Sequence, residues 1–117
     1  MADTTFRHGD PVMVDYTPAS GNIATGQVVL AGNTAGLCCL IAHGPIENNV
    51  QGAMAAGGGV YDVVNLNNSA NYAKVYWDDT NNKVTSVSTN NALFGFIVAS
   101  GGGGANTTCR ALHKPYV

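Results

Sequence analysis

Short stretches in which apolar residues occupy every second position recur along the chain. The clearest is 73–77, where Val75 and Trp77 alternate with Lys74 and Tyr76. Alternation with a period of two is typical of a β-strand that has one buried face. We therefore predict a strand in which Val75 and Trp77 point into the core, while Lys74 and Tyr76 lie on the other face.

Further strands are predicted where alternating or wholly apolar runs stand between clusters of turn residues. The runs 37–41 and 93–98 are apolar on both faces. Such strands are either central and covered on both sides, or their outer face is buried by a partner chain. We predict irregular structure for 43–59 and strands at 11–16, 26–30, 36–42, 60–64, 73–77, 83–88, 92–98 and 106–113.

The predicted fold class is all-β, a small antiparallel β-sandwich or barrel of about eight short strands. The chain has 15 glycines and a single glutamate, Glu47, a composition that disfavours surface helices. Residues 1–10 show no period, which predicts an N-terminal arm. The β-domain is expected over 11–113, followed by a tail at 114–117 and with a glycine turn at 101–104.

The low content of charged residues argues against several classes of function. Charged residues make up 10% of the 117-residue chain, and seven acidic against five basic residues give a net charge of −2. Without a basic patch, we expect no nucleic-acid binding and no binding to anionic membranes. No apolar run is long enough to cross a bilayer, and the polar first residues predict no signal peptide. Such low charge with 45% hydrophobic residues predicts a homo-oligomer or a permanent place in an assembly.

The cysteines are the first candidates for site chemistry. Cys38, Cys39 and Cys109 could form a zinc site with His43 or His113, but the second pair of ligands at short spacing is missing. We instead expect the three thiols to be buried as small hydrophobic groups, with Cys38 and Cys39 on opposite faces of one strand. No metal and no cofactor are predicted.

Catalytic motifs are also absent from the sequence. The glycine runs 57–59 and 101–104 lack the Lys-Ser/Thr ending of a phosphate-binding loop. Residues 78–82 lack the glycine and the closing glutamate of a calcium loop. No serine stands in a Gly-x-Ser-x-Gly elbow. We predict no catalytic residues and a protein that is not an enzyme.

Several segments of the sequence resemble motifs of a known protein family, and this resemblance suggests a function. Residues 73–85, AKVYWDDTNNKVT, resemble the signature of the tailed-phage capsid cement or head decoration proteins, in which a Lys-Val-Tyr-Trp-Asp strand, a short turn and Lys-Val-Thr follow each other. Residues 59–63, 91–96 and 105–112 resemble further strands of that family in the same order. The resemblance covers most of 11–113.

The resemblance implies a structural virion protein that is made in the bacterial host cytoplasm. It would bind the outer surface of a bacteriophage head and stabilise contacts between major capsid subunits. The alternative is a virion-surface β-domain that binds a glycan or a host receptor. The partners expected are the major capsid protein and further copies of the chain, as a trimer at threefold positions of the capsid or, alternatively, a dimer at twofold positions.

Contact residues follow from these expectations. The arm carries Phe6, Arg7 and His8, and we expect it to become ordered only on the capsid, with Phe6 as an anchor and Arg7 paired with capsid carboxylates. The alternative is a frayed terminus without a role. The oligomer interface is expected to include Tyr76, Phe94 and Phe96.

Overall fold

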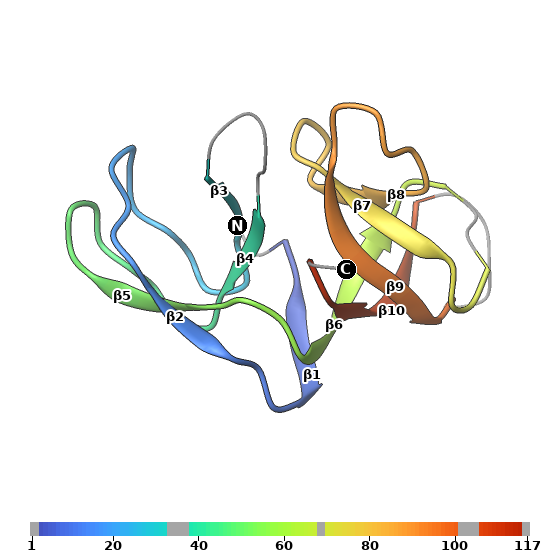
Figure 1. Ribbon diagram of the computed structural model, residues 1–117, viewed down its shortest axis with the longest axis horizontal. Helices are drawn as coiled ribbons and strands as arrows, with labels where there is room; N and C mark the ends of the chain where they lie inside the picture. Colours follow the sequence, from blue (N-terminus) through green and yellow to red (C-terminus); the bar gives the residue numbers. More distant parts are fainter. Residues whose placement is uncertain (1–2, 33–37, 68–69, 101–105, 116–117) are drawn as a thin grey trace.

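The computed structural model describes residues 3–32, 38–67, 70–100 and 106–115 and consists of ten β-strands in two sheets (Figure 1). The all-β prediction is confirmed, and each of the eight predicted strands has a counterpart. No helix that could span a membrane occurs among the described residues. The turn predicted at 101–104 lies outside them. The strands are β1 (Thr5–Gly9), β2 (Met13–Tyr16), β3 (Val28–Ala31), β4 (Cys38–Ala42), β5 (Gly52–Ala55), β6 (Gly59–Asn65), β7 (Lys74–Asp78), β8 (Lys83–Thr85), β9 (Ala92–Ala99) and β10 (Thr107–His113).

The first sheet closes on itself, and we call it the closed lobe. Its strand order is β1-β6-β10-β9-β7-β8, and β8 returns to pair with β6 through Asn65 and Val84. The backbone N–H of Leu66 also donates to the carbonyl of Val84, at 2.8 Å. This closure turns five of the strands into a small barrel, with β1 added on the outside of β6.

The second sheet stays open, and we call it the open lobe. Its order is β2-β5-β4-β3, with every neighbouring pair antiparallel. In Figure 1 the two lobes stand on either side of β1, and the chain crosses from one to the other between β5 and β6. The sheet therefore ends in two edge strands, β2 and β3, whereas the closed lobe ends only at β1.

The main core lies inside the closed lobe and extends to the face of β4 that covers it. Val75 and Trp77 are fully buried in it, while Lys74 is exposed and Tyr76 half-buried, so the predicted faces of this strand are confirmed. The indole ring packs near Phe94, with 6.1 Å between the ring centroids, and its Nε1 donates to an Asp79 carboxylate oxygen. The large aromatic rings therefore gather in the closed lobe.

Strand β4 is covered on both faces by its own chain. Cys39 and Ile41 belong to the main core, whereas Leu40 and Ala42 belong to a second cluster with Met54 on the far side of the open lobe. The apolar run at 37–41 is thus explained by a central strand and needs no partner chain; its first residue, at 37, lies outside the described part of the chain.

The prediction of an arm at 1–10 is wrong for Thr5–Gly9, which form β1 and pair antiparallel with β6. All five residues are exposed, so the strand lacks the alternation by which strands are predicted. A β-bulge between Phe6 and His8 disturbs the pattern further. The N-terminus is also fixed to the open lobe, because the N–H and the hydroxyl of Thr4 both donate to the Gly26 carbonyl.

Strand β5 also forms within a region predicted to be irregular. Its sequence, Gly-Ala-Met-Ala, contains small residues in three of four positions and has no β-branched side chain. Tertiary packing nevertheless places Met54 and Ala55 fully inside the protein, on opposite faces of the sheet.

A second bulge changes the outer face of β9. Val75 pairs with Gly95 and Tyr76 with Leu93, which leaves Phe94 without an opposite residue on β7. Gly95 has a φ of 154°, and a Cβ there would lie 1.8 Å from the carbonyl oxygen of Leu112, so only glycine fits. The bulge separates the two phenylalanines that flank it: Phe94 is fully buried, whereas Phe96 is half-exposed.

Candidate functional site

The residues predicted to contact a capsid lie together on β1, at the free edge of the closed lobe. Phe6, Arg7 and His8 are exposed, with 41% of Phe6 accessible. The Phe6 ring is not free, because it packs against His43 and Tyr61 with centroid distances of 4.8 and 5.4 Å. The strand is therefore a preformed surface, and the expectation that these residues become ordered only on a partner is wrong.

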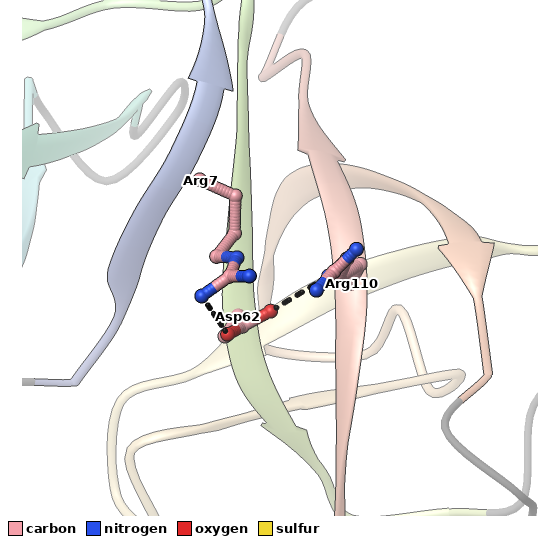
Figure 2. A network of polar contacts seen from close by, with 3 residues as sticks. All are labelled: Arg7, Asp62 and Arg110. Atoms are coloured by element: carbon pink, nitrogen blue, oxygen red, sulfur yellow. Dashed lines mark hydrogen bonds and ion pairs between the residues drawn. The ribbon is translucent and has the colours of Figure 1, made fainter.

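Arg7 is part of a charged network on the outside of the closed lobe (Figure 2). Its Nη1 lies 3.6 Å from one carboxylate oxygen of Asp62 on β6, and the Nε of Arg110 on β10 donates to the other at 3.2 Å. Two guanidinium groups share a single carboxylate, which leaves a net positive charge at this point. Sequence reasoning missed Asp62 and Arg110, since only the pairing of three distant strands brings them together.

A cavity of about 350 Å³ lies between β1 and the open lobe. The Nε2 of His43 lies 2.5 Å from the hydroxyl oxygen of Tyr61 at its wall. Burial lowers the pKa of His43 and raises the pKa of Tyr61 far above its usual range, so both groups are neutral at physiological pH. The cavity is lined by Thr4, Thr5, Phe6, Thr25, Gly26, Ala42, His43 and Tyr61.

His113 joins the two lobes from the inside. Its side chain is fully buried, and its Nε2 lies 2.8 Å from the carbonyl oxygen of Cys39 in β4. A carbonyl only accepts, so Nε2 carries the proton, and the buried Nδ1 has no hydrogen-bond partner among the described residues. Burial lowers the pKa of His113 to about 4, opposed by the bond to Cys39 and aided by the charge of nearby His43. The imidazole acts as a neutral structural link.

The prediction that the thiols are buried packing groups is confirmed for Cys39 and Cys109, whereas Cys38 is only half-buried. Cys39 and Cys109 are buried in the main core, while half-buried Cys38 packs against the second cluster on the opposite face of the open lobe. Burial raises the pKa of Cys39 to about 12 and that of Cys109 to about 11, so neither forms a reactive thiolate at neutral pH. Within the described residues, no three His, Cys, Asp or Glu side chains converge as a metal site would require.

Of the three residues predicted for an oligomer interface, the structure buries one and leaves two partly exposed. Phe94 is enclosed in the main core and is therefore not available to a partner chain, a consequence of the bulge at Gly95. Phe96 and Tyr76 lie half-exposed on the outer face. Whether they contact another copy stays a prediction.

Phe96 is the centre of a larger group that we call the outer patch. It pairs across the ladders with Lys74 on one side and Leu112 on the other, and the ring of Tyr72 lies 6.5 Å from its own. Tyr72 is 74% exposed, the largest fraction among the exposed large hydrophobic residues in the described part of the chain. No sequence pattern singles it out, because it lies in a turn before β7. The outer patch consists of Tyr72, Lys74, Phe96 and Leu112.

A second exposed apolar surface belongs to the open lobe. Val12, Met13 and Val14 are 62%, 44% and 37% accessible, and Asp15 beside them is exposed. Strand β2 is an edge strand that pairs only with β5 among the described strands. We call Val12–Asp15 the β2 surface. The whole stretch from 8 to 73 contains no lysine or arginine, so this side of the protein is acidic.

Comparison with known protein families gives one match. A family model described as phage cement protein matches residues 6–112, a span that begins within β1 and ends within β10. Comparisons with curated proteins and with solved structures find no match.

Proposed function

The chain belongs to the phage cement protein family, and on this premise we propose that it binds the outer surface of a phage head and stabilises contacts between neighbouring major capsid subunits. Family membership itself gives the protein a structural role as a component of the capsid. The observation that carries the proposal is the length of the match, which takes in all of the fold from β1 to β10.

For the capsid contact we propose the exposed residues of β1, namely Phe6, Arg7 and His8. Three features support this choice. The strand is a free edge of the closed lobe, so its outer backbone groups are open to pairing. Phe6 is partly exposed on a rigid aromatic base, and Arg7 and Arg110 together exceed the single negative charge of Asp62. A partner with carboxylates beside an apolar position would complement this surface.

We further propose that the protein acts as a homo-oligomer, with a trimer at threefold positions and a dimer at twofold positions as the alternative. The low content of charge and the two exposed apolar surfaces support an assembly in which these surfaces are buried. Point-group symmetry of the oligomer would then match a symmetry axis of the shell.

The experiment is to add the purified protein to expanded heads that lack it and to measure binding by co-sedimentation and electron microscopy. We expect density on the outside of the shell and greater resistance of decorated heads to heat. Arg7→Glu should weaken binding at least tenfold. Lys83→Gln is the matched control, since Lys83 bonds to Asn106 at a different part of the closed lobe. Heads that bind no protein, or density inside the shell, would contradict the proposal.

A further inference from the structure

Tyr72 combines two properties that are rarely found together. Its backbone has a φ of 67°, in the left-handed region that a bulky side chain disfavours, and its ring is 74% exposed. The other four non-glycine residues with positive φ among those described are all asparagines, which tolerate this conformation. An exposed aromatic ring held on a strained backbone needs an explanation other than packing of the fold.

The backbone around Tyr72 is fixed on both sides by β9. The N–H of Tyr72 donates to the carbonyl of Ile97 at 2.6 Å, and the N–H of Ile97 donates to the carbonyl of Ala73 at 3.0 Å. The ring leans over Phe96 rather than into the core. The tyrosine is thereby presented outward in one defined position, which is the property of a preorganised anchor at a protein interface.

The surroundings of Tyr72 define the chemistry of what it would bind. The outer patch joins three apolar side chains with the ammonium group of Lys74, for which no ion pair is found among the described residues. A matching surface must therefore offer exposed apolar side chains next to a carboxylate.

The β2 surface of the same protein meets this description. Met13 and Asp15 are exposed on one face of the edge strand and Val12 and Val14 on the other, since neighbouring strand residues alternate, and Asp15 has no ion pair among the described residues. No lysine or arginine lies between 8 and 73 to weaken the negative charge of this side.

From this complementarity we propose that the outer patch of one copy binds the β2 surface of a second copy, with Tyr72 as the anchor and Lys74 facing Asp15. The contact joins two different surfaces, so it is heterologous and leads to a closed ring when the rotation between copies allows it. The inference rests on the proposed homo-oligomer and specifies its interface.

The decisive variant is Tyr72→Gly. Glycine adopts positive φ without strain, so the fold and the thermal midpoint of the variant should equal or exceed those of the unchanged protein. Loss of the anchor should nevertheless raise the dissociation constant of the oligomer at least about 30-fold, the effect of an interface hot spot. Sedimentation velocity measures the association, and Val87→Ser, which removes an exposed apolar side chain elsewhere, is the matched control.

A charge exchange identifies the partner. Lys74→Glu and Asp15→Lys should each weaken the association, and the protein that carries both changes should recover most of it, because opposite charges face each other again. A capsid surface as the true partner of Lys74 would not allow this recovery. Increasing salt should weaken the unchanged oligomer.

The outcomes separate this inference from the proposed function, since binding to heads is measured on the same variants. An oligomer that survives Tyr72→Gly overturns the interface, as does an unchanged protein that is monomeric at micromolar concentration. Weaker binding of Tyr72→Gly to heads with an intact oligomer would assign the outer patch to the capsid instead. Failure of every variant, and of the unchanged protein, to decorate heads would overturn the proposed function alone.

Discussion

The closed lobe and the open lobe are built from similar strands but solve the problem of sheet edges differently. In the closed lobe, β8 returns to β6, so one free edge is left at β1. The open lobe ends in two edges, of which β3 is partly capped by the Asp3 carboxylate that accepts from the N–H of Val28. Of the two edges of the open lobe, β2 is the one with exposed large hydrophobic side chains among the described residues, whereas the free edge of the closed lobe exposes part of Phe6. Folded proteins usually protect such edges, which agrees with the proposal that a second copy covers β2.

The two lobes also differ in the size of their apolar side chains and in their charge. The closed lobe holds Trp77, Phe94 and Tyr61 in its interior and carries the lysines and arginines of the chain, including Arg7 on β1. The open lobe has smaller apolar residues and no basic ones. We therefore expect truncation of the large aromatic side chains of the closed lobe to cost more stability than loss of exposed side chains on the open lobe.

The largest expected effect is that of Trp77→Ala. The side chain is fully buried and packs beside Phe94, so its truncation should lower the free energy of unfolding by about 3–5 kcal/mol. Urea denaturation followed by circular dichroism measures the change, and Lys74→Ala on the same strand should change it little. A loss below about 1 kcal/mol would show that the closed lobe does not dominate stability.

The second largest effect is expected from acid, which should lower the free energy of unfolding through His113, the residue that links the two lobes. His113 has a pKa lowered to about 4 in the folded protein against 6.5 in the unfolded chain, so the unfolded chain binds more protons between these values. Stability from this group is therefore complete above pH 6.5 and decreases as the pH falls towards 4, by about 3 kcal/mol at most.

The measurement is the free energy of unfolding as a function of pH in the unchanged protein and in His113→Gln. The pKa of His43 is also lowered, so some pH dependence with the same sign should persist in the variant. Identical pH profiles of the two proteins would contradict the assignment to His113.

Arg7→Gln should have a smaller effect on folding. The guanidinium group and Asp62 are both partly exposed, at 43% and 26%, and solvent screening leaves such a pair worth less than about 1 kcal/mol. Thermal unfolding at low and high salt tests this, with Lys83→Gln as the control. A loss well above that value would mean that β1 is held mainly by its charges and not by its ladder with β6.

Val14→Ser should change stability least, by less than about 0.5 kcal/mol, because the side chain is exposed on an edge strand of the open lobe. The same variant should weaken self-association, as measured by sedimentation velocity. A clear loss of stability in the monomer would contradict the placement of Val14 outside the buried clusters of this lobe.

The sequence predicts a strand and its orientation best where one face of the strand is buried and the other is exposed to solvent. The alternation around Trp77 predicts both the strand and its buried face correctly. It fails for β1, where every side chain is exposed, and for β5, whose small residues show no preference for a strand. In both cases pairing with a distant strand, not local preference, decides the structure.

The candidate site was less predictable because it depends on irregularities and on long-range pairing. The bulge at Gly95 reverses the face on which Phe94 lies, and a period-two pattern cannot contain such a shift. The Arg7–Asp62–Arg110 network forms because β1 and β10 flank β6, and no sequence motif predicts this strand order. Tyr72 is identified only by its backbone angle and its exposure.

The position of β1 and β10 on either side of β6 has a mechanical consequence. Thr5 pairs with Asp62 in the middle of β6, whereas His113, the last residue of β10, pairs with Gly95 and lies beyond the Leu112–Val60 pair, towards the Gly59 end of β6. Opposite forces applied to these two ends of the chain would run along the strands and load many backbone hydrogen bonds of both ladders at once, instead of opening them one after another. Because resistance to forced unfolding is set by the rate of such a rupture, the fold is arranged to withstand tension between its ends.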